Sequence, residues 1–207
     1  MEDIMKLVQE YTLFRMGSPF EVEELEKEGD NIYFRGELVQ DENAKYSEGS
    51  TFLNIAYSFK NSAGRVLSNL YPLSFKFRGK WVNSIEGVLQ GIKYKDKKTQ
   101  NKVLKYSGID AYHTRVANEQ DFWGNTQKLY WQGKEIDRNS NEYQLFIDEL
   151  YISASKNPLY QRFLLSTGDK YLLHHIGKEN PNETVLTRDE YEIRLNTLRE
   201  FLREKQK

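Results

Sequence analysis

The chain contains no cysteine and only three histidines among its 207 residues. The lack of cysteine excludes disulfides and thiolate metal sites, and it fits a reducing cytoplasm. Three histidines are too few for a histidine-rich metal centre, so we expect neither a metal nor another cofactor. No apolar run approaches the ~20 residues that span a membrane, and the first residues lack the basic and apolar segments of a signal peptide. These absences predict a soluble, cytoplasmic protein that does not associate with membranes.

Charge of either sign is not in excess, because charged residues make up 29% of the chain and the formal net charge is −1. No global basic surplus points to nucleic acid, and no acidic surplus points to a basic partner. Aromatic residues are abundant at 14%, and most of these rings should fill the core. The length suits one domain with a substantial core, or a domain with a small accessory segment.

Helix signals dominate the second half of the chain. Ser140 can cap a long helix, Asn157 followed by Pro158 can start another, and Thr187 opens a capping box before a final amphipathic helix. A further helix is expected over residues 3–13. Strands are expected within residues 31–40, 51–60, 73–77 and 170–175, a solvated loop or short helix over 21–30, and a turn at 61–64. We therefore predict an α+β single domain in which helices pack around a small sheet.

The most informative segment is residues 84–93, in which Ser84 can cap a helix that carries Glu86, Gln90 and Lys93. Positions i, i+4 and i+7 fall within about 60° of one another on a helix. The aliphatic residues of the segment occupy a separate arc about 100° wide, which can be buried. A carboxylate can give or take a proton, and a lysine amine can attack an anomeric carbon to form a Schiff base. The alternative is an ordinary surface helix with a solvated polar face.

Three other segments carry polar or aromatic groups, each with two possible roles. Residues 68–72 (Ser-Asn-Leu-Tyr-Pro) form either a simple turn or a loop whose Asn meets a ligand while its Tyr stacks. Trp131 is either a core residue or an aromatic wall for a base or ribose. His174 and His175 are adjacent, so in a strand they point to opposite faces and at most one faces inward.

Lysines are concentrated between Lys93 and Lys105. This cluster is either a solvated amphipathic segment or a local patch that contacts the phosphates of nucleic acid. Gly177 and Lys178, followed by Pro181, form a loop that could touch a phosphate. No Gly-rich phosphate cradle occurs in the sequence, so these residues are the remaining phosphate candidates.

These segments occur in an order that resembles the NADAR family (NAD- and ADP-ribose-associated proteins), which includes YbiA-like N-glycosidases. The family pattern is a Ser-Asn-aromatic loop, a Gly-x-x-aromatic segment and Ser-x-Glu-x-x-x-Gln-x-x-Lys. In this chain, the three parts correspond to residues 68–72, 79–82 and 84–93. Further similar blocks are residues 130–134, 157–159, 164–168, 174–178 and 180–187. The resemblance covers residues 67–202, about two-thirds of the chain.

The resemblance implies cleavage of an N-glycosidic bond to a ribose, such as removal of ADP-ribose from guanine or hydrolysis of phosphoribosylated intermediates of riboflavin synthesis. It implies that Glu86 and Lys93 are the catalytic residues. The candidate substrate-binding residues are Ser68, Asn69, Tyr71, Trp81, Gln90, Trp131, His174, Gly177 and Lys178. The expected partners are ADP-ribosylated nucleic acid, an ADP-ribosylated nucleotide or another N-ribosyl small molecule. A non-catalytic module that binds ADP-ribose or nucleotides is the alternative function.

The chain departs from the family pattern at several positions. Leu70 replaces the usual Phe of the first loop, and Gly87 and Gly91 stand where bulkier residues are common, at a cost to the helix of ~1 kcal/mol each. The Asp-x-x-Trp-Gly segment of the YbiA-like branch is absent near the C-terminus, which counts against a riboflavin-type substrate. Residues 1–60 match no pattern of the family, so we expect an N-terminal extension packed on a domain that spans residues 61–207.

Overall fold

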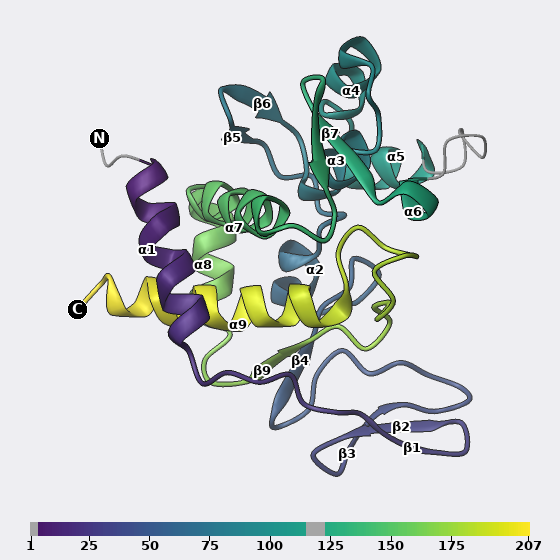
Figure 1. Cartoon of the computed structure of the whole chain (residues 1–207). Coiled ribbons are helices and arrows are strands. Elements are labelled where there is room, and N and C mark those ends of the chain that lie inside the picture. Colours follow the sequence, from purple (N-terminus) through teal and green to yellow (C-terminus); the bar gives the residue numbers. More distant parts are fainter. Residues whose placement is uncertain (1–3, 115–122) are drawn as a thin grey trace.

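The computed structural model describes residues 4–114 and 123–207 and has the expected α+β architecture, with both ends of the chain on one side (Figure 1). The helices are α1 (Ile4–Gly17), α2 (Ser62–Leu67), α3 (Ile85–Gly91), α4 (Lys97–Val103), α5 (Gly108–His113), α6 (Trp123–Thr126), α7 (Asn141–Ser155), α8 (Pro158–Ser166) and α9 (Arg188–Glu204). The strands are β1 (Glu26–Glu28), β2 (Asn31–Phe34), β3 (Glu37–Gln40), β4 (Phe52–Asn54), β5 (Phe75–Phe77), β6 (Lys80–Val82), β7 (Lys128–Trp131), β8 (Lys134–Asp137) and β9 (Tyr171–Leu173). None of these helices is long and apolar enough to cross a membrane.

Within the described residues the strands form four small sheets, where the sequence suggested one. Strands β1, β2 and β3 make an antiparallel sheet, and β5–β6 and β7–β8 are antiparallel hairpins. Strand β4 pairs in parallel with β9, which comes more than a hundred residues later in the chain. The β4–β9 pair therefore joins the first half of the chain to its last quarter.

Four local expectations differ from the structure. The strand expected over residues 31–40 is a hairpin of β2 and β3, because Arg35 and Gly36 turn the chain with positive φ angles. The strand expected over residues 51–60 ends at Asn54; Ile55 still donates a hydrogen bond of 2.7 Å to the Leu173 carbonyl, but residues 55–60 form no strand. Residues 61–64 begin helix α2 rather than form a simple turn, because the Asn61 Oδ1 atom accepts a hydrogen bond of 3.0 Å from the Gly64 amide. Residues 26–28 form the edge strand β1, whose charged side chains are all exposed. Charge on an edge strand discourages pairing with other chains.

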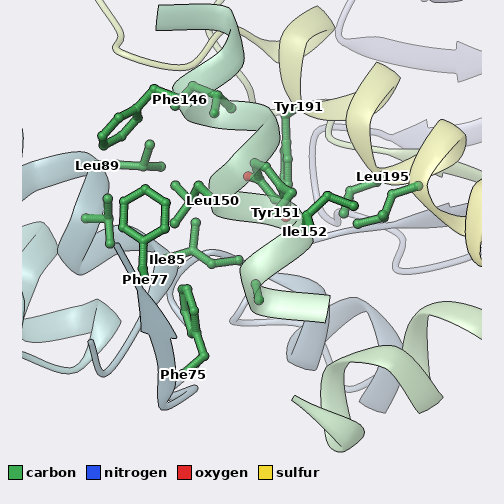
Figure 2. Packing of buried hydrophobic residues seen from close by; sticks show 14 of the residues in the cluster. Phe75, Phe77, Ile85, Leu89, Phe146, Leu150, Tyr151, Ile152, Tyr191 and Leu195 are labelled. Atoms are coloured by element: carbon green, nitrogen blue, oxygen red, sulfur yellow. The ribbon is translucent and has the colours of Figure 1, made fainter. Parts of the chain in front are cut away.

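Helix α7 occupies the centre of the main hydrophobic core. Its fully buried residues at helical spacing are Tyr143, Phe146, Ile147, Leu150, Tyr151 and Ala154. Figure 2 shows that Phe146 and Leu150 face Phe77 and Leu89, whereas Ile152 lies toward Leu195. The core thus packs the β5–β6 hairpin and α3 on one side of α7 and α9 on the other. This arrangement holds α3 against the core.

Elements of the first 60 residues pack into two hydrophobic clusters. Residues Leu7, Val8 and Tyr11 of α1 belong to the main core. A second cluster contains Phe34, Val39, Phe52, Tyr171 and Leu173. Each cluster thus contains residues from both ends of the sequence.

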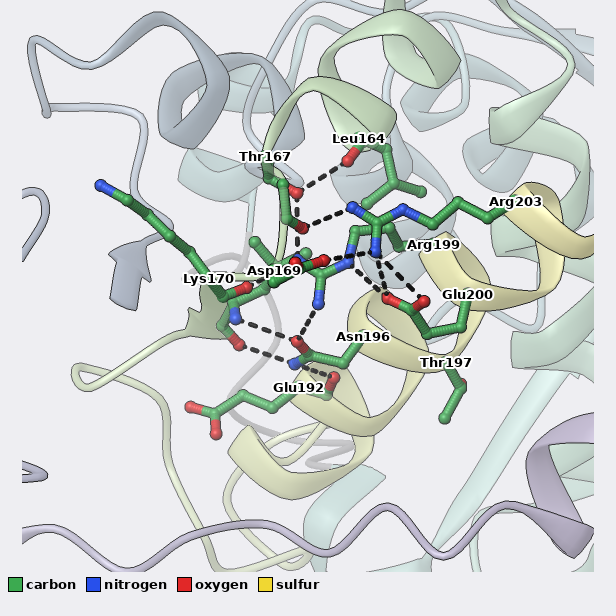
Figure 3. A network of polar contacts seen from close by, with 12 residues as sticks. Leu164, Thr167, Asp169, Lys170, Glu192, Asn196, Thr197, Arg199, Glu200 and Arg203 are labelled. Carbon is green, nitrogen blue, oxygen red and sulfur yellow. Dashed lines mark hydrogen bonds and ion pairs between the residues drawn. The ribbon is translucent and has the colours of Figure 1, made fainter. Parts of the chain in front are cut away.

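Helix α9 is tied to the segment around β9 by polar contacts (Figure 3). The Asn196 carboxamide accepts a hydrogen bond of 3.0 Å from the Leu172 amide and donates one of 3.0 Å to the Leu172 carbonyl. Arg199 donates to the Lys170 carbonyl at 2.6 Å and to the Thr167 hydroxyl at 3.1 Å. These bonds fix the strand from which the next residue, His174, extends.

Candidate active site

Helix α3 carries Glu86 and is buried on all its faces. It ends at Gly91, earlier than the sequence suggested, so Lys93 lies in the turn that directly follows the helix. Ser84 caps it as expected, because its Oγ accepts a hydrogen bond of 2.9 Å from the Gly87 amide. The aliphatic face packs into the core, and Glu86 and Gln90 on the polar face are only 9% and 6% exposed. The polar face is therefore enclosed by the protein and is not the solvated face of a surface helix.

The two glycines of α3 allow other segments to pack closely against it. A Cβ atom at Gly87 would lie 3.2 Å from the Val103 carbonyl oxygen, and one at Gly91 would lie 3.2 Å from a methyl group of Leu104. Both contacts are tighter than nine in ten Cβ contacts in proteins, so the neighbouring atoms would have to move. Glycine lowers the helix propensity of α3, but it also allows α4 and the turn after it to pack directly against this helix.

Gln90 joins the two predicted catalytic residues in a hydrogen-bonded chain. Its Nε2 atom donates to Glu86 Oε1 at 2.7 Å, and its Oε1 atom accepts from Lys93 Nζ at 2.7 Å. The carboxamide orientation follows from its neighbours, because a carboxylate can only accept and an ammonium can only donate. Hydrogen bonds to charged groups are stronger than those between neutral groups. The chain therefore holds the carboxylate and the amine in a defined arrangement on one face.

The loop of residues 68–72 is anchored to α3 and α7 through Asn69. Its carbonyl oxygen accepts a hydrogen bond of 3.0 Å from the Glu86 amide, and its Oδ1 atom accepts one of 2.8 Å from the Tyr151 hydroxyl. Ser68, next to it, is 8% exposed, and its Oγ accepts from the Leu70 amide at 3.3 Å. The loop thus lies against the start of the helix that carries Glu86.

His174 is held as a neutral ring beside this helix. Its Nδ1 atom lies 2.7 Å from the Ile55 carbonyl oxygen, so Nδ1 carries the proton and Nε2 is left as an acceptor. Burial lowers the pKa of His174 below the ordinary value for a histidine. The backbone amide of His174 donates to Glu192 at 2.7 Å, which ties the residue to α9.

Tyr191 of α9 connects His174 with Glu86. Its ring packs edge-to-face on His174, with 5.0 Å between the ring centroids, and its hydroxyl donates to the Leu67 carbonyl at 2.8 Å. Burial is the main cause that raises the pKa of Tyr191 well above its ordinary value, and the negative charge of Glu86 adds to the effect. Tyr191 is therefore a neutral hydrogen-bond donor at the side of Glu86.

These groups surround a cavity of about 1150 Å³. Pockets that hold small molecules usually measure about 300–1,000 Å³, so this cavity is large enough for a nucleotide-sized ligand. Eight of the eleven candidate residues line it: Ser68, Asn69, Glu86, Gln90, Lys93, His174, Gly177 and Lys178. Within residues 4–114 and 123–207, no three metal-ligating side chains come together.

The structure does not bring the other three candidates into the cavity. Trp131 is in the core, with its ring centroid 5.1 Å from that of Phe77 and 5.5 Å from that of Phe146. Trp81 is 67% exposed on β6, outside the cavity. Tyr71 is partly buried at the edge of the core. Side chains alternate along a strand, so Trp131 shares the inward face of β7 with Leu129, whereas Tyr130 lies on the opposite face and lines the cavity.

Trp123 lines the cavity, and the sequence did not predict it as a site residue. The Nζ atom of Lys93 lies 5.5 Å from its ring centroid, within the range of a cation–π contact. Tyr112 and Tyr130 also line the cavity, as do Lys95 and Lys128. The sequence singled out no feature of Trp123 beyond the Gly124 that follows it. The aromatic candidates expected from the sequence were therefore of the right type but at other positions.

Known proteins are similar to this chain over most of its length. The family described as "Bacteriophage protein GP30.3" matches residues 61–200. A protein of Enterobacteria phage T4, described as an uncharacterized 17.1 kDa protein in the Gp30-rIII intergenic region, is 29% identical over 140 residues, which cover 66% of this chain and 90% of that protein. The NMR structure of the E. coli protein YbiA has a TM-score of 0.48 and 17% identity, and the match covers 77% of this chain and 93% of YbiA.

Proposed function

The chain belongs to the bacteriophage protein GP30.3 family, and we propose that it is an N-glycosidase that cleaves the bond between a ribose and a nucleobase. The proposed substrate is ADP-ribose attached to guanine, in nucleic acid or in a nucleotide. The observation that carries the proposal is the hydrogen-bonded chain of Glu86, Gln90 and Lys93 along the wall of a cavity of about 1150 Å³. The resemblance of the sequence blocks to the NADAR family supports the same chemistry.

The carboxylate of Glu86 suits the charge that develops in this reaction. When the base leaves, positive charge accumulates at the anomeric carbon, and a nearby carboxylate stabilises it. The same carboxylate can take a proton from the water as its oxygen bonds to this carbon, and this proton then passes to the departing nitrogen as its bond to the carbon breaks. The hydrogen bond from Gln90 orients the carboxylate for either role.

The amine of Lys93 can take part in two ways. It can hydrogen-bond the ribose, or it can bond to the anomeric carbon as the base leaves, after which the sugar ring opens to an imine that water hydrolyses. The ring of Trp123 beside the amine supplies a flat apolar surface for a base or ribose. The lysines on the cavity wall, among them Lys95 and Lys178, are suitable partners for the two phosphates.

The decisive experiment incubates the purified protein with ADP-ribosylated guanosine and follows the masses of free guanosine and free ADP-ribose. The wild-type protein should release both products. Glu86→Gln should keep the far-UV circular dichroism spectrum and lose most of the turnover. The matched control is Glu142→Gln, because Glu142 is a surface carboxylate on α7 that pairs with Lys134 outside the cavity.

Each other outcome selects a different function. Binding of ADP-ribose without product would favour the non-catalytic binding module. Turnover of a phosphoribosylated pyrimidine, without turnover of the guanosine adduct, would favour a riboflavin-type substrate. Near wild-type rates in Glu86→Gln would remove Glu86 from the mechanism.

A further inference from the structure

The proposed chemistry uses only Lys93 and Lys95 of the lysine cluster, and it does not use the exposed Trp81. Residues 93–105 contain six lysines and one aspartate in a chain whose net charge is −1. Trp81 is 67% exposed, although large aromatic side chains are usually mostly buried. Both features lie outside the core, and the structure relates them to each other and to the cavity.

Helix α4 presents lysines along a single exposed face. Lys98 and Lys102 are four residues apart on α4 and therefore lie on the same face of the helix, and Lys105 lies in the turn that directly follows α4. All three are exposed, whereas Val103 and Leu104 are buried against α3. In the part of the chain that the structure describes, the ion pairs include none of these three lysines. We call these three residues the lysine stripe.

The lysine stripe runs from the cavity to the β5–β6 hairpin. At the N-terminal end of α4, Asp96 and Thr99 line the cavity. At the other end, the Asn83 side chain donates to the Lys105 carbonyl at 2.7 Å, and its backbone amide donates to the Leu104 carbonyl at 3.1 Å. Asn83 directly follows β6, and the short helix α4 rises only about 1.5 Å per residue. The hairpin therefore lies close to the cavity rim along the stripe.

The outer face of the hairpin combines an aromatic ring with a positive charge. Trp81 pairs with Lys76 across the two strands, so their side chains lie side by side on the face opposite the buried Phe75, Phe77 and Val82. Lys76 is exposed, and no ion pair among the described residues includes it. Exposed aromatic rings interleaved with lysines are the usual means of binding single-stranded nucleic acid without sequence preference.

We propose that the lysine stripe and the outer face of the β5–β6 hairpin bind the single-stranded nucleic acid that carries the modified base. The lysines contact consecutive phosphates, and Trp81 stacks on an unpaired base of the same strand, while the modified nucleotide occupies the cavity. Because the C-terminal end of α4 packs on Gly87 and Gly91, the lysine stripe lies next to the helix that carries Glu86. This inference rests on the proposed function in placing the substrate base in nucleic acid, but strand binding itself can be measured without turnover.

The first measurement is the affinity for an unmodified, fluorescein-labelled single strand of about 12 nucleotides, followed by anisotropy at several salt concentrations. Trp81→Ala should weaken binding by about 5- to 150-fold, which is the usual range for loss of a stacked base. The control Leu13→Ala removes an equally exposed apolar side chain from α1 and should bind as the wild type. Equal affinity of Trp81→Ala and the wild type would overturn the stacking role.

The lysines are tested by the slope of affinity against salt. Combined Lys98→Ala, Lys102→Ala and Lys105→Ala should reduce the slope by about 2, since each phosphate contact to a single strand contributes about 0.7. The control combines Lys27→Ala, Lys45→Ala and Lys60→Ala, which removes the same charge from exposed positions elsewhere. Equal slopes for the two triple variants would overturn the role of the lysine stripe. Binding of poly-glutamate or of duplex as tight as that of the single strand would also overturn it.

Kinetics then separate this inference from the proposed function. Trp81→Ala should lower kcat/KM about tenfold or more on an ADP-ribosylated oligonucleotide and should leave turnover of ADP-ribosylated guanosine unchanged. A parallel loss on both substrates, or on neither, would overturn the role of Trp81 in strand binding. A wild-type protein that cleaves neither substrate would refute the proposed function. The strand-binding data would still show whether the lysine stripe and the hairpin bind nucleic acid.

Discussion

The Nζ atom of Lys93 donates a hydrogen bond of 2.7 Å to the Oε1 atom of Gln90, one helical turn earlier. The amine is thereby connected to the Glu86 carboxylate through a neutral group. A carboxamide can satisfy an acid and an amine at once, because it has a donor and an acceptor at opposite corners. The geometry of the candidate catalytic pair therefore depends on a residue that has no charge of its own.

Gln90→Ala should separate the two charged groups without removing either. We expect kcat/KM to fall by at least about tenfold, because two hydrogen bonds to charged groups, each contributing about 1.5–3 kcal/mol, are lost. The measurement is steady-state turnover of ADP-ribosylated guanosine, with a thermal melt to verify folding. Thr99→Ala, on the exposed rim of the same cavity, is the control and should retain activity. Wild-type kinetics in Gln90→Ala would show that the link is dispensable.

Lys93→Arg distinguishes a nucleophilic amine from an orienting charge. If an imine forms during turnover, borohydride should trap a covalent ribosyl adduct on Lys93, which peptide mass spectrometry would locate. The arginine variant keeps the positive charge but cannot form the imine, so it should be inactive and give no adduct. Full activity of Lys93→Arg would instead indicate direct attack by water, assisted by Glu86.

Trp131→Ala and Trp123→Ala should have opposite effects. Trp131 packs against Phe77 and Phe146, so its loss should cost about 3–5 kcal/mol of stability and leave affinity per folded molecule unchanged. Trp123 lines the cavity, so its loss should weaken substrate binding by about 1–3 kcal/mol. A melting curve and a binding titration on each variant make the comparison. Weaker binding in Trp131→Ala alone would reverse the two assignments.

His175 should make stability depend on pH in the acidic range. Burial is the main cause that lowers its pKa to about 4, with added repulsion from Lys45, His174 and Arg188. The neutral ring accepts from Asn54 at 2.7 Å, and protonation would remove this acceptor.

The sign follows from the two states of the chain. Between the ordinary pKa of 6.5 and about 4, the unfolded chain binds a proton that the folded chain does not. His175 therefore costs no stability above pH 6.5, and stability falls by up to about 1.4 kcal/mol per pH unit as the pH drops through this window. Urea unfolding at several pH values should show this slope in the wild type and a smaller one in His175→Gln. Equal slopes would exclude His175 as the cause.

Many of the helices could be predicted from the sequence, because the residues that start a helix act on their close neighbours in the chain. The Ser84 cap, the Asn157-Pro158 start and the Thr187 capping box each mark a helix in the structure. Asn61 shows where such signals become ambiguous, because the same side chain favours a turn or the start of a helix. Its role was decided by the rest of α2, in which Ala63 and Leu67 pack in the core, beyond the reach of a four-residue pattern.

The aromatic wall of the candidate site could be predicted only in kind. Trp131 and Trp123 are both mostly buried, and burial by itself does not tell a core residue from one that lines a cavity. Alternation along residues 128–131 offered a usable signal, because it pairs Trp131 with Leu129 and puts Tyr130 on the other face. The position of Trp123 depends on tertiary contacts, such as that to Lys93, which no local pattern contains. The roles of the cavity residues in catalysis stay predictions until they are measured.

The hydrogen bond between His174 and the Ile55 carbonyl spans 119 residues of chain. Contacts between distant segments form slowly, because a long loop must close before they are gained. During synthesis, which proceeds from the N-terminus, the parallel pairing of β4 must wait until β9 has left the ribosome. The wall formed by His174 and Tyr191 is therefore among the last parts of the molecule to assemble. A nascent chain that has already folded α3 still has an open, unfinished cavity, so ligand binding should appear only with the completed polypeptide.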